Sequence, residues 1–467
     1  MKLYIYAFML IVSGSISANA NTYAVSPGGN LNSISKAILQ AQNGDSIIVD
    51  GGVYKEKLLI GKEIKLIGKN SPEIIGDGKG TIISVSAPNV TIQGFHISNT
   101  GSNLNLEDSA VVLDNSAGSV IKDNIIKNVL FGIYLKNSPD CLVLNNIITG
   151  KDLPLPDRGD SIRLWYSSGT AIKGNKISKT RDLVMWWSGD TVIEDNIVEE
   201  GRYGLHYMYS NNNIFKNNIF RANLVGGFLM YSKNIRFENN TFIQNQGVAS
   251  GYGVGFKDLD LVTAVGNKFI DNRVGIYMDN TPTSFDVWNT IEGNKIAFND
   301  IGASLMPSIE RNAIIGNNFI DNNEQVEVRG GGSLKGNKWF EQSRGNYWSD
   351  YKGYDENSDG IGDFPYVAES LFENMMDRNS VLRVFIHSPV TQALDIAAKA
   401  FPVFKPAPKL KDEYPLTSPT ENLLESDIII KFNIRVLIAY FILIVCPLIT
   451  LIILIRPYKE QIIDRNK

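Results

Sequence analysis

Residues 204–223 read GLHYMYSNNNIFKNNIFRAN and contain the two patterns that decide the fold of the chain. The second half places an Asn pair before two apolar residues that favour β-strands and a polar end. Such segments recur along the chain, and the Asn or Asp that marks them stands at positions 123, 145, 175, 195, 217, 240, 267, 294, 317 and 337. A repeat of 20 to 30 residues with short β segments and no helical stretches predicts a parallel β-helix. We expect this all-β solenoid over residues 21–345, with stacked Asn side chains that hydrogen-bond from coil to coil.

The first half of the stretch, GLHYMYS, belongs to a second repeated element. Aligned copies are GIYLKNS from Gly132, SIRLWYS from Ser161, DLVMWWS from Asp182 and GGFLMYS from Gly226. Side chains alternate between the two faces of a strand, and the second and fourth positions of these copies are nearly all apolar. These positions therefore face the core, and they include Ile133, Leu164, Leu205 and Leu229.

The outward positions of the same element are unusually apolar. Four consecutive coils present Trp165, Trp186, Met208 and Met230 in one column, and Met306 occupies that column farther along. A contiguous exposed stripe of this kind usually marks a binding surface. The candidate partner surface consists of Trp165, Trp186 and Phe228.

The outward stripe also offers ligands for a soft metal ion. His206 lies two residues from Met208, and thioethers and imidazole suit Cu(I). The candidate copper ligands are His206, Met208, Met230 and Met306. The alternative is a hydrophobic docking surface without metal, or a face that the C-terminal segment covers.

A second candidate metal site lies in the expected C-terminal extension, residues 346–400. Asp355, Asn357, Asp359 and Asp363 fall at positions 1, 3, 5 and 9 of a calcium-loop pattern, with Gly360 at position 6. Position 12 departs from the pattern because it is Tyr366 instead of Glu. A structural Ca²⁺ loop and a plain loop of Asx turns both fit these residues.

The two ends of the chain indicate export and a membrane tether. Residues 1–20 have a basic start, a short apolar core and an Ala-Asn-Ala cleavage site, so they predict a signal peptide. Residues 434–456 contain a charge-free apolar run long enough for one transmembrane helix, and the basic tail 457–467 is then cytoplasmic. A Pro-rich linker over 401–433 would cross from the body to the membrane. A helix over 31–42 would cap the first coil, and residues 391–400 have helical composition.

The composition excludes several other classes of protein. Lys and Arg total 45 against 49 Asp and Glu, so the net charge of −4 predicts no nucleic-acid partner. The only cysteines are Cys141 and Cys446, which excludes a disulfide framework.

Three stretches together resemble the NosD family. They are GLHYMYSNNN from Gly204, GNYWSDYKGYD…DGIGDFPY from Gly345, and SPVTQALDIAAKAFPV from Ser388. The resemblance implies a right-handed β-helix and a non-enzymatic, periplasmic role in the maturation of nitrous oxide reductase. It also implies work with the permease and ATPase of an ABC transporter and with a copper chaperone, to deliver copper and assemble the copper centres of the reductase. The C-terminal span is not general in that family, so anchoring in the inner membrane is an addition here.

The same fold is also compatible with a polysaccharide-binding or polysaccharide-cleaving protein. A lyase, hydrolase or epimerase needs carboxylates or basic groups clustered across adjacent coils. The aligned outward positions supply only scattered charges, and the best cluster is Asp157, Arg158 and Asp160 in the insertion loop 151–160. Release of uronate from polysaccharides would favour this alternative.

Overall fold

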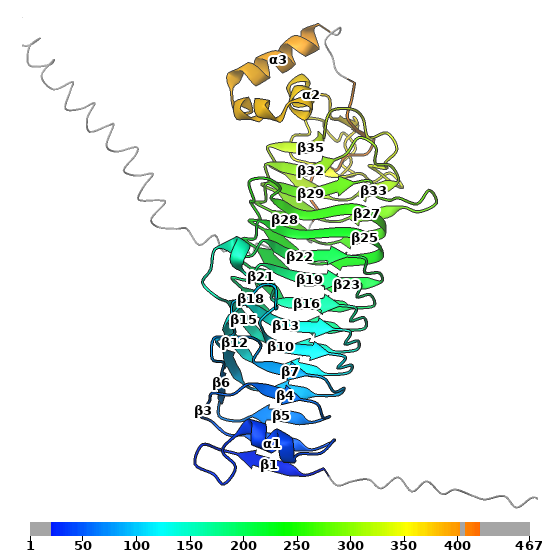
Figure 1. Cartoon of the computed structure of the whole chain (residues 1–467). Helices are drawn as coiled ribbons and strands as arrows, with labels where there is room; N and C mark the ends of the chain where they lie inside the picture. Colours follow the sequence, from blue (N-terminus) through cyan, green and yellow to red (C-terminus); the bar gives the residue numbers. More distant parts are fainter. Residues whose placement is uncertain (1–19, 402–406, 421–467) are drawn as a thin grey trace, which may run out of the picture. The chain divides into compact units, whose positions relative to one another are not determined.

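The structure, a computed structural model, describes residues 20–401 and 407–420. Within these residues the chain forms the predicted solenoid, and Figure 1 shows its coils stacked along one axis. The strands form one sheet of 23 strands, one of 13 strands and a small sheet of two. The described residues thus adopt a right-handed parallel β-helix of about 13 coils.

A typical coil contributes one strand to each of three faces. The first, called the site face below, consists of β4 (Leu58–Ile60), β7 (Ile83–Val85), β10 (Ser109–Asp114), β13 (Phe131–Lys136), β16 (Ile162–Trp165), β19 (Asp182–Trp186), β22 (Tyr203–Met208), β25 (Val225–Glu238), β27 (Tyr252–Val265), β29 (Val274–Asp279), β32 (Ile301–Leu305) and β35 (Glu324–Val328). The strands β25 and β27 continue into the second face, which joins both faces into the 23-stranded sheet.

The other two faces complete each coil. The rest of the second face consists of β1 (Thr22–Val25), β2 (Ser46–Val49), β5 (Lys65–Gly68), β8 (Thr91–Gln93), β11 (Val120–Lys122), β14 (Leu142–Leu144), β17 (Ala171–Lys173), β20 (Val192–Glu194), β23 (Asn213–Lys216), β30 (Asn289–Glu292) and β33 (Asn312–Ile315). The third face consists of β3 (Val53–Tyr54), β6 (Glu73–Ile75), β9 (His96–Ser98), β12 (Ile125–Val129), β15 (Ile147–Gly150), β18 (Lys176–Ser178), β21 (Ile197–Glu199), β24 (Ile219–Arg221), β26 (Thr241–Ile243), β28 (Lys268–Ile270), β31 (Lys295–Ala297), β34 (Asn318–Ile320) and β36 (Tyr347–Trp348).

The repeated marker motif forms the corner between the second and third faces. Its first residue has a left-handed backbone, as at Asn217 with φ of 54°, which Asn, Asp and Gly tolerate best. Its second residue, such as Asn218, is buried, and its amide donates to the side chain of Asn240 in the next coil at 2.9 Å. The same bond links Asn124, Asn146, Asn175, Asn196, Asn218, Asn240, Asn267, Asn294, Asn317 and Asn346. The expected ladder is therefore present.

The last marker of the sequence repeat belongs to another ladder. Asn337 accepts a hydrogen bond from the Asn312 side chain at 2.9 Å, whereas Asn346 ends the main ladder. The pairing of β36 with β34 also carries the solenoid to Trp348, past the predicted end at residue 345. A loop before Asn346 lengthens the final coil. The regular spacing of the markers therefore pointed to Asn337, which is nearer in sequence to the preceding marker.

The predicted register of the site face is confirmed. Ile133, Leu164, Leu205 and Leu229 are each at most 1% exposed, and Met208 is half-buried on the opposite side of its strand. A shift of one residue would have reversed these positions.

The predicted capping helix is shorter than expected. The helix α1 (Ile34–Gln40) begins after Ser33, whose hydroxyl accepts from the Lys36 backbone N–H. Its buried residues include Ile34 and Ile38, so the helix covers the apolar end of the first coils. The insertion loop adds only the short 3₁₀ helix η1 (Leu155–Asp157).

The C-terminal extension folds onto the other end of the solenoid. It contains α2 (Leu371–Arg378), the 3₁₀ helix η2 (Ser380–Phe385) and α3 (Pro389–Ala400), which includes the predicted helix. The strands β37 (Tyr366–Val367) and β38 (Lys411–Asp412) pair antiparallel. Asp412 is buried and accepts from the Trp348 indole at 3.0 Å, and the Thr420 backbone N–H donates to Asn318. Residues 407–420 of the predicted linker are therefore packed structure and not a free spacer.

The predicted membrane segment lies outside the described residues. Residues 434–456 and the tail 457–467 are beyond Thr420, and the predicted signal peptide lies before residue 20 except for its last position. No helix within residues 20–401 and 407–420 is long and apolar enough to span a bilayer.

Candidate functional site

Four side chains on the site face form one column across β16, β19, β22 and β25. The parallel register pairs Trp165 with Trp186, Trp186 with Met208, and Met208 with Met230. All four are half-buried, so each keeps part of its surface in solvent. Because adjacent strands lie about 4.8 Å apart, the two thioethers start from neighbouring backbone positions.

The imidazole of His206 lies beside this column and is held on three sides. Its Nδ1 is 3.2 Å from Oδ2 of Asp182. The ring stacks on Tyr203 with centroids 5.0 Å apart and meets Trp186 edge-on at 5.2 Å. A carboxylate at Nδ1 favours the tautomer with its proton on that nitrogen, in which Nε2 is the nitrogen available to a ligand.

Asp182 is itself fixed in the charged form. Its side chain is 1% exposed, and Arg202 donates to it from Nε at 3.0 Å as well as from Nη2. Burial alone would raise the pKa of Asp182, but the hydrogen bonds from His206 and Arg202 outweigh it and lower that pKa. An ionised carboxylate therefore stands behind the imidazole.

A buried ion network extends from this group toward the N-terminal coils. Asp160 lies 3.2 Å from Nη2 of Arg181 and 3.8 Å from Nη1 of Arg163, and Arg163 also pairs with Glu107 at 2.7 Å. Burial raises the pKa of Asp160 to about 6 despite these arginines. The carboxylates of Asp160 and Asp182 are thus both engaged by arginines.

A second column, which was not predicted from the sequence, adjoins the first. Tyr166, Trp187, Tyr209 and Tyr231 stand at the corner after the site-face strands, and their rings stack with centroids 5.1–5.4 Å apart and planes within 13°. The three tyrosines are between 42% and 50% exposed. We call these four residues the aromatic ladder.

The backbone conformation at this corner is unfavourable for the large side chains of the aromatic ladder. All four residues have φ between 49° and 53°, a region that large side chains rarely adopt. In flanking coils the same left-handed corner carries Asn115, Asn137, Asp258 and Asn280, which suit it. Aromatic residues thus replace Asn and Asp in the four coils that carry the Trp and Met column, and locally unfavourable choices of this kind cluster at functional sites. The aligned triplets WYS, WWS, MYS and MYS contained this signal.

Phe228, a predicted partner-surface residue, pairs in register with His206, and its ring centroid lies 6.5 Å from that of Tyr203. Phe228 packs across Gly255, where any Cβ would come within 2.4 Å of the ring, and it stacks with Tyr252 and Tyr277 at 5.9 and 6.3 Å. Phe228 is therefore mainly part of an aromatic cluster.

Met306 shares the column of Met208 and Met230 but is separated from them. Lys257 and Asp279 occupy the intervening coils, and their side chains pair with each other at 3.2 Å. The structure thus places Met208 and Met230 at neighbouring positions of one column, with His206 on the same strand as Met208, and separates Met306 from them.

The calcium prediction is not supported. The oxygens of the loop accept hydrogen bonds from its own backbone: Asp355 accepts from Gly360 N at 2.8 Å, and Asp363 accepts from Glu356 N at 2.8 Å. Asn357 and Asp359 are bonded to each other at 3.0 Å. Across the residues that the structure describes, no three His, Cys, Asp or Glu side chains converge to hold a metal ion. Asn357 and Asp359 also accept from the backbone N–H two residues on and so form Asx turns, the alternative reading of the spacing.

The remaining group has the donor chemistry of a soft cation site. Two thioethers on adjacent strands and an imidazole nitrogen with a free lone pair match Cu(I), which prefers such ligands over hard oxygens. Met side chains have flexible torsions and can turn toward a shared ion. The residues present therefore fit copper.

The fold defines the class of protein, the right-handed parallel β-helices. A family model described as "Periplasmic copper-binding protein (NosD)" matches residues 144–353, and a model for proteins of unknown function matches residues 61–224. A "Probable ABC transporter binding protein NosD" of Pseudomonas aeruginosa is 31% identical over 78% of this chain and 86% of its own length. A relative of the same name from Stutzerimonas stutzeri is 30% identical over 84% and 91%. The chain belongs to the NosD family, whose members are periplasmic.

Solved structures agree on the fold. The catalytic domain of a GH87 alpha-1,3-glucanase in complex with tetrasaccharides superposes with a TM-score of 0.50. It is 12% identical and covers 71% of this chain and 70% of its own. At that identity the likeness shows the β-helix alone.

Proposed function

We propose that this protein is a periplasmic accessory factor for the maturation of nitrous oxide reductase, and that it receives copper and presents it for assembly of the copper centres. Support comes from the family description as copper-binding and from the two relatives named as ABC transporter binding proteins. The observation that carries the proposal is the register of Met208 with Met230, together with the Asp182-bound imidazole of His206 two residues before Met208 on the same strand.

Each residue of the group has a distinct role in this proposal. Met208 and Met230 supply the soft donors, and His206 supplies Nε2. Asp182 is a positioning residue, because its carboxylate fixes the ring and makes Nε2 a better donor. The site lies on a half-exposed surface, which suits transfer between partners better than long storage.

The aromatic surroundings would receive the partners. Trp165, Trp186 and the aromatic ladder form an apolar area beside the ligands, and a docked protein would bury it and exclude water from the ion. Trp and Tyr are enriched at the energetically important centres of protein interfaces. In our proposal a copper chaperone docks here to donate the ion, and the reductase docks here to accept it.

An ABC transporter would drive the exchange of partners. Its permease and ATPase are the transporter components that the family resemblance implies, and the predicted helix over 434–456 would keep this chain near them in the inner membrane. Conformational change in the transporter then alters which partner the site face can reach.

The proposal is tested in cells that lack the native gene and carry variants of it. Met208→Leu combined with Met230→Leu preserves side-chain volume but removes both thioethers, and we expect a copper-poor, inactive reductase. Met375→Leu is the matched control, because Met375 is exposed on α2, which packs at β35, several strands beyond β22 and β25. A fully loaded reductase in the double variant would refute copper transfer through these thioethers.

A further inference from the structure

Two tyrosines of the aromatic ladder stand next to the proposed copper ligands. Tyr209 follows Met208 in the chain, and Tyr231 follows Met230. The two phenol rings stack with their centroids 5.1 Å apart and their planes within 13°. Tyr209 is 45% exposed and Tyr231 is 42% exposed, so dissolved oxidants reach both rings. The pair therefore combines close contact between two phenols, access from solvent and, in the proposed function, a neighbouring redox-active ion.

The pair joins neighbouring coils. Met208 and Met230 are paired in the register of β22 and β25, and the Tyr209 backbone N–H donates to the Met230 carbonyl at 3.3 Å. The corners that carry the two rings are thus about 4.8 Å apart, the spacing of adjacent strands. Because each side chain is half-exposed, its χ angles can change without displacing the core. Rotation of the rings can therefore bring together the ring carbons that adjoin the two hydroxyl groups.

The order of rings in the aromatic ladder distinguishes this pair from Tyr166. Trp187 lies between Tyr166 and Tyr209, with its ring centroid 5.2 Å from the first and 5.4 Å from the second. Tyr166 is 50% exposed, but it stacks on an indole and not on a phenol. Within the ladder, Tyr209 and Tyr231 are therefore the phenols that adjoin.

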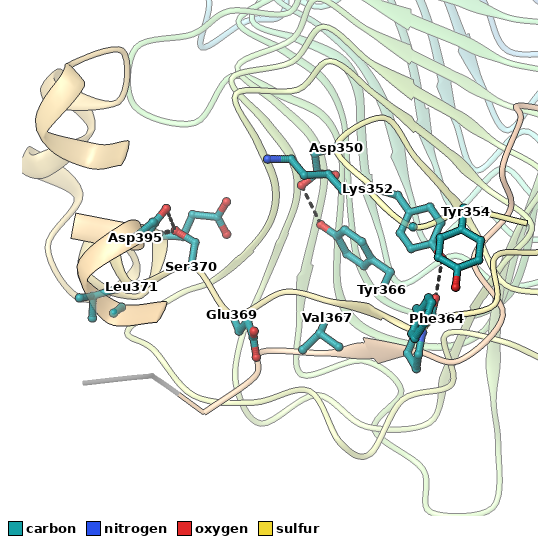
Figure 2. A pocket seen from close by; sticks show the side chains of 15 residues that line it. Asp350, Lys352, Tyr354, Phe364, Tyr366, Val367, Glu369, Ser370, Leu371 and Asp395 are labelled. Carbon is teal, nitrogen blue, oxygen red and sulfur yellow. Dashed lines mark hydrogen bonds between the residues drawn. The ribbon is translucent and has the colours of Figure 1, made fainter. Parts of the chain in front are cut away.

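An exposed tyrosine elsewhere shows what the pair adds. Tyr354 is 59% exposed and lines a cavity between the end of the solenoid and the C-terminal helices (Figure 2). The ring that meets it edge-to-face, with centroids 5.3 Å apart, belongs to Phe364. Phenylalanine has no hydroxyl group and forms no phenoxyl radical. Tyr354 is therefore accessible to oxidants but lies against a ring that cannot couple with it.

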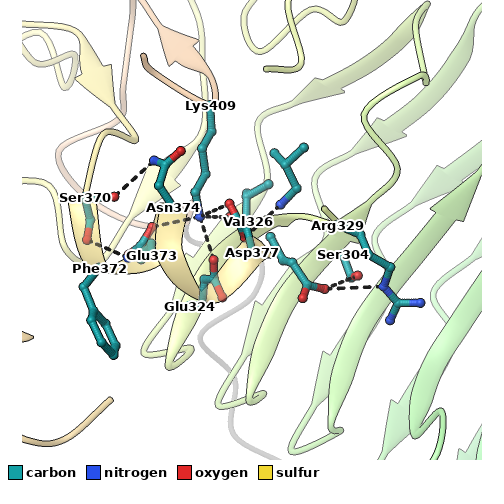
Figure 3. A network of polar contacts seen from close by, with 12 residues as sticks. Ser304, Glu324, Val326, Arg329, Ser370, Phe372, Glu373, Asn374, Asp377 and Lys409 are labelled. Carbon is teal, nitrogen blue, oxygen red and sulfur yellow. Dashed lines mark hydrogen bonds and ion pairs between the residues drawn. The ribbon is translucent and has the colours of Figure 1, made fainter. Parts of the chain in front are cut away.

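A buried tyrosine pair provides the opposite comparison. The rings of Tyr252 and Tyr277 are closer, with centroids 4.6 Å apart, but they are 8% and 7% exposed. Phe228 stacks on both rings, and the guanidinium of Arg329 lies 5.0 Å from the ring centroid of Tyr277. Arg329 is itself held beside the Glu327 carboxylate at 4.0 Å (Figure 3). These rings are enclosed, so they meet few oxidants and have little room to rotate.

We propose that Tyr209 and Tyr231 form a dityrosine cross-link when hydrogen peroxide reacts at the copper-loaded site, a step that rests on the proposed function. Each phenol gives up one electron and one proton, and the two phenoxyl radicals join in a new C–C bond between the ring carbons that adjoin their oxygens. The hydrogens on these carbons move to the oxygens and restore both hydroxyl groups. Hydrogen peroxide takes up the two electrons and two protons and becomes two water molecules, while copper passes between Cu(I) and Cu(II) and ends unchanged.

The cross-link connects the coils of Met208 and Met230 covalently. It closes the chain between Tyr209 and Tyr231 into a loop, which restricts the unfolded chain as a disulfide does. It also fixes two rings of the docking surface in one orientation. Exposure of the loaded site to peroxide thus alters the surface that receives the partners.

The first experiment tests the pair without copper. The metal-free full-length protein is oxidised by tris(bipyridine)ruthenium, light and persulfate, which remove single electrons from phenols. Trypsin then yields peptides 203–216 and 222–233, and we expect them joined, with a mass two hydrogens below their sum. The link should be lost in Tyr209→Phe and in Tyr231→Phe and kept in the matched control Tyr252→Phe. Absence of the link in the wild type, or a yield that falls on dilution as a link between two molecules does, would overturn the proposal.

The second experiment tests the copper step. Anaerobic protein receives one equivalent of Cu(I) and then hydrogen peroxide, and we expect the same joined peptides in the wild type. The Met208→Leu, Met230→Leu double variant should lose this link but still form it with the ruthenium oxidant. Oxidation of the thioethers to sulfoxides adds oxygen to the peptides without joining them.

The outcomes separate the cross-link from the proposed function. Copper that binds in chelator competition but produces no link with peroxide would overturn the cross-link and leave the copper site standing. A peroxide-driven link of undiminished yield in the double variant would place the copper elsewhere and contradict the proposed function itself. A link between Tyr252 and Tyr277, or one from Tyr354, at the yield of the ladder pair would overturn the selectivity for exposed, stacked phenols.

Discussion

The carboxylate of Asp182 lies 3.2 Å from Nδ1 of His206, on the neighbouring strand of the site face. This contact orients the ring and leaves Nε2 as the nitrogen that can bind copper. We expect Asp182→Asn to weaken Cu(I) binding by about 10–100-fold, the usual effect of removing such a partner. Nitrogen NMR of His206 should show the Nδ1–H tautomer in the wild type.

An Asp182→Asn variant that fails to fold would also lose Cu(I) binding, so the experiment needs a control for folding. Arg202→Gln serves as the control, because it removes the other side-chain partner of Asp182 while the contact with His206 and the bond from the Tyr203 backbone N–H remain. Unchanged Cu(I) affinity in Asp182→Asn, with the wild-type tautomer, would show that His206 needs no positioning.

The separation of Met306 from the other sulfurs predicts unequal effects of Met→Leu changes. Met208→Leu and Met230→Leu should each weaken Cu(I) binding about tenfold or more, because each removes one soft donor from the group. Met306→Leu should leave that affinity unchanged, since Lys257 and Asp279 lie between. Equal losses from all three substitutions, measured by competition with a Cu(I) chelator, would mean that the sulfurs act together.

In the aromatic ladder, we expect a substitution at Trp187 to impair function while leaving the stability of the fold nearly unchanged. Trp187→Asn places at the left-handed corner the type of residue that flanking coils use, so relief of strain should offset the lost stacking. We expect the free energy of unfolding to change by less than about 1 kcal/mol. Copper loading of the reductase should nevertheless fall, because a docking surface is lost. Normal loading would assign the ladder a purely structural role.

The Asn ladder predicts a steep loss of stability at buried positions only. Asn218→Ala leaves the backbone and side-chain donors of Asn196 without their acceptor, so we expect destabilisation by about 3 kcal/mol. Asn217→Gly should be nearly neutral, because Gly accepts the positive φ of this exposed position. Chemical denaturation measures both, and equal effects at the two positions would contradict the ladder account.

The fully buried ammonium group of Lys409 contacts three carboxylates, Glu324 at 2.6 Å, Asp377 at 3.0 Å and Glu373 at 3.2 Å. This Lys409 network predicts a pH-dependent anchor for the C-terminal segment. Burial raises the pKa of Glu373 to about 7 and of Asp377 to about 8, although Lys409 opposes the shift. Carboxyl pKa values raised by folding stabilise the folded state at low pH, and this contribution is lost as the pH rises toward 8. Nearby Glu324 and Arg383 are paired at 2.7 Å.

Hydrogen exchange measures this anchor directly. After correction for intrinsic rates, protection of residues 371–378 and 409–412 should be lower at pH 8.5 than at pH 6. Asp377→Asn should flatten this dependence, since it removes one excess carboxyl group. Protection that increases with pH in the wild type would have the wrong sign for this network.

The fold was predictable because its signals are local and periodic. The alternation that places Leu205 inside and Met208 outside has a period of two residues, which tolerates no slip. Each residue of the marker dipeptide also has a clear structural role. Asn217 adopts the left-handed backbone of the corner, and Asn218 donates to the next side chain of the Asn ladder. Both features repeat in many coils, so errors at a single coil do not propagate.

The parts that were missed depend on contacts between distant segments or on a single irregular coil. The pairing of β19 with β22 shifts by one residue between Asp182 and Val184, so that Asp182 pairs with Tyr203. Alignment of copies at constant spacing hides such a shift. The burial of Lys409 against Glu324 joins residues 85 positions apart, and a Pro-rich composition alone resembles a free linker.

The central claim is that His206, Met208 and Met230 bind Cu(I) as one site. The most direct measurement is anaerobic competition titration of the full-length protein with a Cu(I) chelator, for the wild type and for a His206→Ala, Met208→Ala, Met230→Ala triple variant. Our account predicts one Cu(I) per wild-type chain at this site and its loss in a folded triple variant. Equal Cu(I) stoichiometry and affinity in the two proteins would contradict it.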